Sequence, residues 1–242
     1  MARRAGAFVA DTPPGAGLYL WLDPSGLHLC RAGRPVSCLR VDFLGGDQGY
    51  RAGQLGRQRE LVARACGIRG NAAINIVDAT AGLGRDGFVL AGLGARVTLI
   101  ERSPVVACLL EDGLARARQG GLDGIASRIR LVHDDALPWL QGLPADRQPD
   151  VIYLDPMYSD GRRRAAAGKA LALLQTLLGD DGEATPLLNA ATGIARDRVV
   201  VKRQRRAPPL GERPPDYALK GRSTRFDVYR VNAARRADAG EY

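Results

Sequence analysis

Short apolar runs alternate with segments of helical periodicity over most of the chain beyond residue 54. A short apolar run predicts a buried strand, whereas apolar positions spaced three and four apart predict a helix. The predicted strands are 74–77, 97–100, 129–132, 151–154, 199–201 and 226–231, and the predicted helices are 58–66, 86–93, 165–178 and one beginning at Ser103-Pro104. This alternation indicates an α/β fold, with helices on both faces of a parallel sheet.

The first 45 residues follow a different pattern, typical of a small antiparallel sheet. Apolar runs at 18–22 and 27–30 flank Asp23-Pro-Ser-Gly26, which suits a type I turn. A third strand is predicted over 36–43, and Gly45-Gly46 ends it. We therefore expect a small N-terminal β subdomain over residues 1–45 and a second domain over residues 46–242.

Composition narrows the class of protein. The chain has 242 residues, of which 45% are hydrophobic and 25% charged, as in ordinary globular proteins. No apolar run approaches the ~20 residues that span a bilayer, and residues 5–10 are too short for a signal sequence, so we expect a cytoplasmic protein without a membrane partner. The four cysteines lack CxxC spacing; zinc and disulfides are not expected, and each cysteine is predicted to be a small buried residue: Cys30, Cys38, Cys66 and Cys108.

The charge is unevenly distributed. The net charge is +9, and residues 151–242 hold 17 basic against 11 acidic residues. Basic runs at 162–164, 202–206 and 220–225 are predicted to lie near one rim and to neutralise RNA phosphates; a solvated charged face is the alternative. The predicted RNA contacts are Arg162, Arg163, Lys202, Arg203, Lys220 and Arg222.

A glycine-rich turn opens the second predicted helix. It runs from Asp78 to Gly87 directly after a strand, and its Gly82-x-Gly84-x-x-Gly87 spacing, with Glu101 further on, also fits a dinucleotide site. This segment alone does not separate NAD from S-adenosylmethionine (SAM). Asp78 favours SAM, because a carboxylate there could approach the methionine ammonium but would repel a pyrophosphate.

Two further acidic positions follow predicted strands. Glu101 ends the second strand, where a carboxylate can accept hydrogen bonds from both ribose hydroxyls. Asp135 follows the third strand and suits an adenine amino group. A surface acid paired with Arg102, and a turn acid, are the respective alternatives.

The most specific motif is Tyr153-Leu-Asp155-Pro156-Met157-Tyr158, at the end of the fourth predicted strand. It is similar to the Asp/Asn-Pro-Pro-Tyr/Phe signature of methyltransferases that act on planar conjugated amines. Such an amine is a poor nucleophile because its lone pair is delocalised. Oxygen acceptors on Asp155 and the loop would let the nitrogen rehybridise, and Tyr158 would stack on a flipped or unpaired base.

The chain resembles RsmJ-type small-subunit ribosomal RNA guanine-N2 methyltransferases over most of residues 36–230. The motifs that carry the resemblance are 40–46, 78–86, 101–106, 112–116, 153–157 and 199–203. The resemblance implies a Rossmann-like, seven-stranded SAM-dependent methyltransferase fold with a small N-terminal β appendage. It also implies methylation of the N2 amine of a guanosine near the 3′ end of 16S ribosomal RNA, without a metal.

The site predicted from the motifs and the resemblance has two parts. The cofactor contacts are Asp78, Gly82, Arg85, Asp86, Glu101, Arg102, Asp135, Ala136 and Asp155, and the catalytic residues are Asp155, Pro156 and Tyr158. Two alternatives stay open: an NAD-dependent oxidoreductase using the Gly82 turn, for which neither His28 nor His133 supplies a persuasive acid–base group, and a non-catalytic RNA-binding module.

Overall fold

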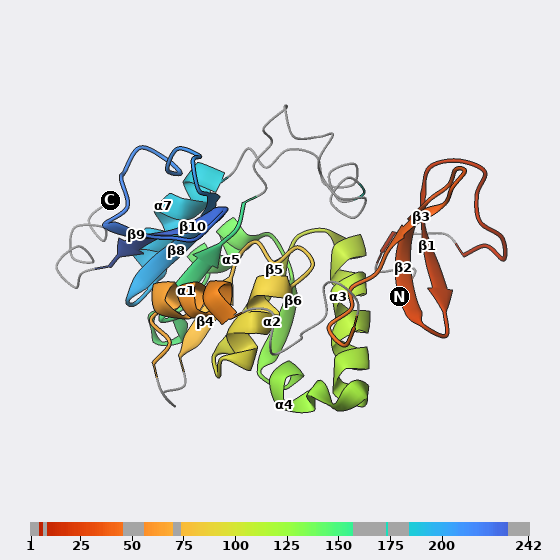
Figure 1. The fold of residues 1–242 in the computed structure, drawn as a ribbon, viewed down its shortest axis with the longest axis horizontal. Coiled ribbons are helices and arrows are strands. Elements are labelled where there is room, and N and C mark those ends of the chain that lie inside the picture. Colours follow the sequence, from red (N-terminus) through yellow and green to blue (C-terminus); the bar gives the residue numbers. More distant parts are fainter. Residues whose placement is uncertain are drawn as a thin grey trace.

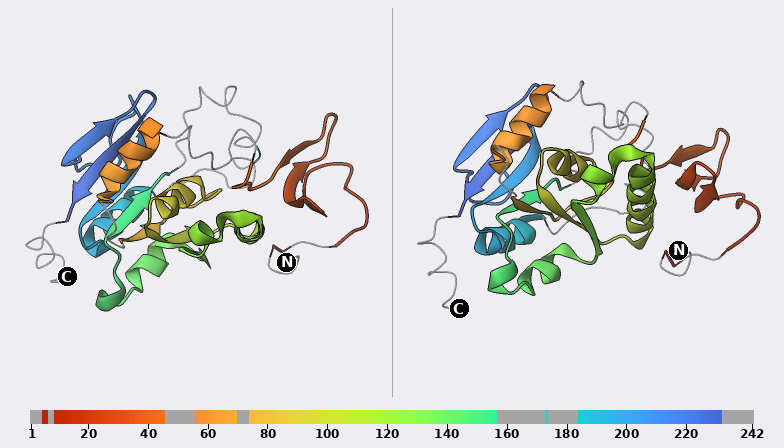
Figure 2. Two further views of the ribbon diagram at one scale, coloured as in Figure 1. Left: turned by 60° about the horizontal axis from the view of Figure 1, so that its bottom comes forward. Right: turned by 90° about the horizontal axis from the view of Figure 1, so that it is seen from below.

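The computed structural model describes residues 5–6, 9–45, 56–69, 74–156, 173 and 184–231. It contains two sheets, a small N-terminal one and a large central one (Figure 1). The small sheet is antiparallel in the order β1-β2-β3 and lies beside helix α3, away from the plane of the large sheet (Figures 1 and 2). Its strands are β1 Leu18–Asp23, β2 Gly26–Arg31 and β3 Ser37–Leu39. The third strand is therefore shorter than predicted.

The large sheet has seven strands in the order β6-β5-β4-β7-β8-β10-β9. They are β4 Asn75–Asp78, β5 Arg96–Glu101, β6 Ile129–His133, β7 Val151–Leu154, β8 Arg198–Gln204, β9 Tyr217–Lys220 and β10 Thr224–Arg230. Strand β10 runs antiparallel to both β8 and β9, so the sheet is mixed rather than wholly parallel. A three-residue connection between β9 and β10 permits only a hairpin, because parallel strands need a long crossover.

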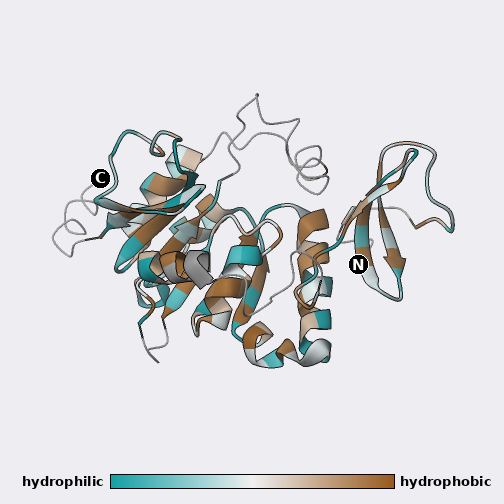
Figure 3. Ribbon diagram, viewed as in Figure 1, coloured by the Kyte–Doolittle hydropathy of each residue, from teal (hydrophilic) through white to brown (hydrophobic). Residues whose placement is uncertain are grey.

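Helices cover both faces of this sheet, as predicted. Helices α1 (Gly56–Cys66), α2 (Arg85–Gly92) and α3 (Pro104–Ala117) belong to one apolar core, while α5 (Ala136–Gln141) and α7 (Ala184–Ile194) belong to the other. Short α4 (Asp123–Ala126) follows α3. Alternate strand residues feed the two cores, and Figure 3 shows hydrophobic residues recurring along the central strands and their helices. The predicted helix 165–178 lies outside the described residues, apart from buried Leu173.

The start of α3 follows the sequence prediction. The Ser103 hydroxyl accepts a hydrogen bond from the Val106 amide at 3.4 Å, and Pro104 occupies the first helical turn. A serine cap satisfies one of the amide groups left without partners at a helix start.

The prediction for two of the cysteines is wrong. Cys30 and Cys38 form a disulfide with an S–S distance of 1.97 Å, because the β2–β3 register places them directly opposite each other. That register is a property of the folded hairpin and is not encoded by a CxxC spacing. Cys66 and Cys108 are free and buried, as predicted.

The small sheet is joined to the rest of the molecule through α3. The Asp112 carboxylate accepts hydrogen bonds from the Leu27 amide (3.1 Å) and from Arg116 Nε (2.9 Å), and Arg116 also donates to the Val41 carbonyl. Further on, the Phe43 ring stacks on Phe88 of α2, with 4.2 Å between centroids. The segment that leaves the small sheet thus reaches the helix that begins at the glycine turn.

No helix among the described residues combines the length and apolar character needed to cross a membrane.

A substitution at Gly113 tests the packing of α3 against Val41, in the segment that leaves the small sheet. A Cβ at Gly113 would lie 2.5 Å from Val41 Cγ1 and 3.1 Å from the Val41 carbonyl oxygen. We expect Gly113→Ala to lower the free energy of unfolding by about 1–3 kcal/mol, measured by urea denaturation, because a stiff side chain and backbone must move. Gly124→Ala in α4, where a Cβ meets nothing within 4 Å, is the control and should be neutral or slightly stabilising. Equal stability of the two variants would contradict this packing.

Candidate active site

Four acidic residues meet at one edge of the large sheet. Asp78, Glu101 and Asp155 end or directly follow β4, β5 and β7, and Asp135 follows β6. These four strands are parallel and in register, so their carboxyl ends lie at the same edge. Ligands of open α/β sheets bind at this edge. The structure therefore brings together the acidic groups that the sequence singled out.

The three glycines of the turn have different roles. Gly82 and Gly84 have φ values of +51° and +70°, a region that favours glycine. A Cβ at Gly84 would lie 2.6 Å from Leu110 Cδ2, and one at Gly87 would lie 2.3 Å from Leu99 Cδ2, so both allow close packing. Among the described residues, a Cβ at Gly82 would meet only the Thr80 carbonyl oxygen, at 3.9 Å. Within this part of the chain, the Gly82 backbone is thus open to close approach by a ligand.

Asp78 is a buried carboxyl with few partners. Its side chain accepts a hydrogen bond from the Thr80 amide at 3.2 Å, and the residue is 2% exposed. Burial raises the pKa of Asp78 to about 8, with a further contribution from the negative charge of Asp86. A cationic ligand group beside this carboxyl would favour its ionised form.

Glu101 and Asp135 bind the backbone. Glu101 is buried; its Oε2 accepts from the Gly82 amide at 3.0 Å and its Oε1 from the Ser103 amide at 2.7 Å, which ties the glycine turn to the start of α3. Asp135 caps α5 by accepting a hydrogen bond from the Leu137 amide at 2.9 Å. This local role corresponds to the turn acid that is the alternative to an adenine contact. Ala136 is the first residue of α5.

An ammonium group bridges two of the predicted site residues. Lys202 on β8 donates to Asp86 Oδ2 at 2.7 Å and to Asp155 Oδ2 at 2.8 Å, and the Tyr153 hydroxyl also donates to Asp86 Oδ2 at 2.7 Å. Burial opposes the charge of Lys202, but Asp155 and Asp86 outweigh it and raise the lysine pKa. Burial raises the pKa of Asp155, and the ammonium of Lys202 acts against this shift. Lys202, predicted as a phosphate contact, is therefore engaged by two carboxylates.

Thr80 joins the Asp155 corner to the glycine turn. The Asp155 amide donates to Thr80 Oγ1 at 2.6 Å, and Pro156 is buried directly after it. Thr80 was not among the residues predicted from the sequence, although its place between Asp78 and Gly82 was a usable signal. The predicted residues Tyr158, Arg162 and Arg163 lie outside the described residues.

The remaining predicted residues differ in exposure. Arg203 is 5% exposed and donates from Nε and Nη2 to the Pro208 carbonyl at 3.1 and 3.0 Å, so it braces the chain after β8. Adjacent strand residues point to opposite faces, which separates Arg203 from Lys202. Exposed positions at the hairpin and around the turn are Lys220, Arg222, Arg85 and Arg102.

Fold and site define a SAM-dependent methyltransferase of the Rossmann-like α/β class. Residues 6–231 match the model of the family described as "Putative SAM-dependent methyltransferase", and the chain belongs to this family. A solved SAM-dependent methyltransferase from Neisseria gonorrhoeae is 36% identical and superposes with a TM-score of 0.78, covering 100% of this chain and 93% of that one. The cofactor is therefore SAM.

Sequence relatives have more specific names. A protein of Thioalkalivibrio sulfidiphilus is 47% identical over 91% of this chain and 88% of its own length, and one of Alkalilimnicola ehrlichii is 49% identical over 92% and 86%. Both are named ribosomal RNA small subunit methyltransferase J. These comparisons support the predicted family and give no support to the NAD-dependent alternative.

The described residues fit this cofactor. Asp78 is a nearly unpartnered carboxyl suited to an ammonium group, and the backbone at Gly82 is open to close approach. Glu101 lies beside the Gly82 turn, where its two carboxylate oxygens accept from the Gly82 and Ser103 amides, and each carboxylate oxygen can accept more than one hydrogen bond. The donor and acceptor set thus matches a ligand with an ammonium and ribose hydroxyls.

The raised pKa of Asp78 makes stability depend on pH. The folded protein holds a proton on Asp78 up to a pKa of about 8, whereas the unfolded chain releases it near pH 4, so this residue lowers stability as pH rises between those values. We expect Asp78→Asn to be more stable than the wild type by about 1–3 kcal/mol at pH 8, with little difference at pH 4.

Urea denaturation at both pH values measures this effect, with Asp123→Asn, an exposed acid on α4, as the control. A stability difference that is the same at both pH values would contradict the assignment. The same Asp78 variant should bind SAM about 10–100-fold more weakly, because a charge-assisted hydrogen bond is lost.

Proposed function

We propose that the protein transfers a methyl group from SAM to the exocyclic N2 amine of a guanosine near the 3′ end of 16S ribosomal RNA, in the cytoplasm. The relatives' names support ribosomal RNA of the small subunit as the substrate. The geometric observation that carries the proposal is the Asp155 corner, hydrogen-bonded to Thr80 of the glycine turn at 2.6 Å. An amine acceptor thereby lies beside the cofactor turn.

The catalytic unit is the domain over residues 46–242, with residues 1–45 as an appendage docked on α3. Asp78 would bind the cofactor's ammonium, and Glu101 would bind its ribose. Gly82 would let the cofactor come close to the backbone. The segment at Asp135-Ala136 would contact its adenine. When bound, SAM supplies an electrophilic methyl group on a sulfonium centre.

Asp155 would prepare the amine. Lys202 occupies Oδ2 of this carboxylate, while Oδ1 has no hydrogen-bond partner among the described residues. Oδ1 would accept a hydrogen bond from an N–H group of the guanine amine. This bond would localise the nitrogen lone pair and align it for transfer of the methyl group. The proton released from the nitrogen would pass to the same oxygen.

Lys202 would act through Asp155 as a positioning residue. Its ammonium favours the ionised carboxylate against the effect of burial, and its second bond, to Asp86, fixes where the ammonium lies. Asp155 must be ionised to accept a hydrogen bond from the amine and afterwards its proton.

The predicted base and RNA contacts complete the proposal. Tyr158 would stack on the guanine, and Arg162, Arg163, Lys220 and Arg222 would meet phosphates near the site. Arg203 would act indirectly, by bracing the chain after β8.

Removing the acceptor tests the mechanism. We expect Asp155→Ala to lower kcat at least about 100-fold with little change in unfolding free energy, because the bond to Thr80 comes from the backbone and remains. The measurement is tritium transfer from labelled SAM to ribosomal RNA of the small subunit, followed by mapping of the methylated guanosine. Asp123→Asn serves as the control and should retain full activity; normal turnover by Asp155→Ala would remove Asp155 from the mechanism.

The pH dependence tests Lys202. Without its ammonium, burial and the nearby Asp86 act on Asp155 against the charge of Arg203 alone, so the pKa of Asp155 rises. We expect Lys202→Met to shift the acid limb of the kcat profile to higher pH and to lower kcat about tenfold or more at pH 7. Lys202→Arg keeps a cation and should preserve the acid limb. An unshifted limb in Lys202→Met would reduce Lys202 to a purely structural role.

A further inference from the structure

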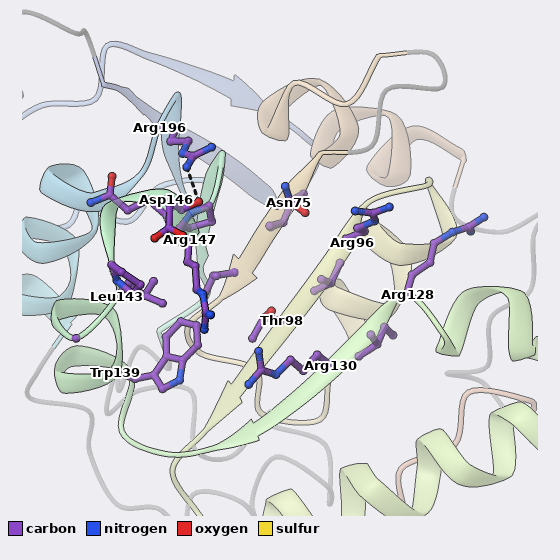
Figure 4. Close-up of a pocket in the computed structure, with 18 of the residues that line it drawn as sticks. Asn75, Arg96, Thr98, Arg128, Arg130, Trp139, Leu143, Asp146, Arg147 and Arg196 are labelled. Carbon is purple, nitrogen blue, oxygen red and sulfur yellow. Dashed lines mark hydrogen bonds between the residues drawn. The ribbon is translucent and has the colours of Figure 1, made fainter.

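A basic groove lies at the end of the large sheet opposite the acidic edge. Its volume is about 840 Å³, and it is lined by the amino-terminal halves of β4–β6, by α5 and by the loop that follows α5. The residues that give it its character are Arg96, Arg128, Arg130, Arg147, Arg196 and Trp139. We call this surface the arginine groove (Figure 4).

The groove exists because α5 is too short to cover this face. Six residues of helix extend about 9 Å, whereas the six residues of β5 extend about 17 Å from the first Cα to the last. The helix packs over Ile100 and Val132 near the carboxyl ends. The amino-terminal halves, where Thr98 and Arg130 are paired in register, line the groove instead.

The charge of the groove is largely uncompensated. Among the described residues, five arginines line it, and Asp146 is the one acidic residue that does. Arg96, Arg130 and Arg147 are exposed, and none of their side chains has a hydrogen bond or ion pair to another residue in the described part of the chain. Like charges gathered in a concave surface create a strong positive potential, which attracts polyanions.

Two arginines shape the groove rather than filling it. Arg196 donates to the carbonyls of Ala145 and Asp146 at 3.1 and 2.8 Å, which fixes the loop after α5, and Arg128 donates to the Ala91 carbonyl at 3.3 Å. The walls of the groove are therefore held in place before any ligand arrives.

An aromatic ring adds a second kind of contact. Figure 4 shows Trp139 on the α5 side of the groove, with Arg130 and Arg147 extending into the space in front of Thr98. The Trp139 ring is only partly buried. Arginines that bind phosphates, combined with an exposed aromatic ring on which a base can stack, are typical of surfaces that bind single-stranded nucleic acid.

We propose that the arginine groove binds the sugar-phosphate backbone of an unpaired segment of the ribosomal RNA substrate, away from the methylated guanosine, with one base against Trp139. This inference rests on the proposed function for the identity of the RNA. The groove and the acidic edge lie at opposite ends of β5, about 17 Å apart along the strand. One RNA that reaches both sites must extend over several nucleotides, so the groove contributes to substrate binding and not to the chemical step.

Charge reversal tests the proposal through RNA binding, measured by fluorescence anisotropy with labelled small-subunit ribosomal RNA and no turnover. We expect Arg130→Glu/Arg147→Glu to weaken binding at least tenfold. We also expect the slope of log affinity against log salt concentration to become less steep by about 1.4, the value for two phosphate contacts on a single strand. Methylation should show a raised KM for RNA with kcat and SAM affinity unchanged.

Two further variants make the result decisive. Arg64→Glu/Arg69→Glu, with the same charge change at exposed positions in and just after α1, should leave both RNA affinity and salt slope near the wild-type values. Arg130→Gln/Arg147→Gln removes the charges without adding acids and should weaken binding less than the reversal.

Unchanged RNA affinity in both groove variants would overturn the proposal, as would a groove that binds poly-glutamate but not RNA, which would indicate an acidic protein partner. If the wild type binds ribosomal RNA through the groove but transfers no methyl group to it, the proposed function fails while the groove assignment stands.

Discussion

The site depends on one partly buried cation, the Lys202 ammonium between Asp86 and Asp155. These three side chains come from β8, from α2 and from the corner after β7, so a single ammonium joins three elements at the carboxyl edge. Two carboxylates drawn close together repel, and a charge removed from water is costly unless it is paired. The ion pairs meet both demands at once, and they leave the Oδ1 atom of Asp155 without a hydrogen-bond partner among the residues that the structure describes.

The same acidic side chain serves different purposes around this edge because the environments differ. Glu101 accepts hydrogen bonds from two backbone amides and holds the glycine turn in place. Asp78 is buried, accepts a hydrogen bond from one backbone amide, and tends to keep its proton because burial raises its pKa. Asp155 is partly exposed and paired with a cation. Under the proposed function, this arrangement would divide scaffolding, cofactor recognition and amine activation among residues of one chemical type.

Sequence patterns could predict the strands and the acidic edge, since apolar runs mark buried strands and parallel strands end together. They could not distinguish Lys202 from Arg203, which are neighbours in a basic run but point to opposite faces of β8, one to carboxylates and one to a carbonyl. The Cys30–Cys38 pair depended on hairpin register, and β9 has no fully buried residue to mark it. Each miss concerns a partner that only the folded chain supplies, whether it lies close in sequence, as for Cys38 and Pro208, or far away, as for the carboxylates of Asp86 and Asp155.

The two ends of the large sheet carry opposite charge, and the fold explains why. At the carboxyl ends of the strands, backbone amides, Lys202 and a cationic cofactor compensate the negative charge of the acidic side chains. On the groove face, no helix among the described residues covers the amino ends of β5 and β6, and arginines line them instead. A substrate that offers a neutral planar base to one end and phosphates to the other is complementary to both. This polarity favours an extended RNA over a small amine as the substrate, because a small amine would have no use for the arginine groove.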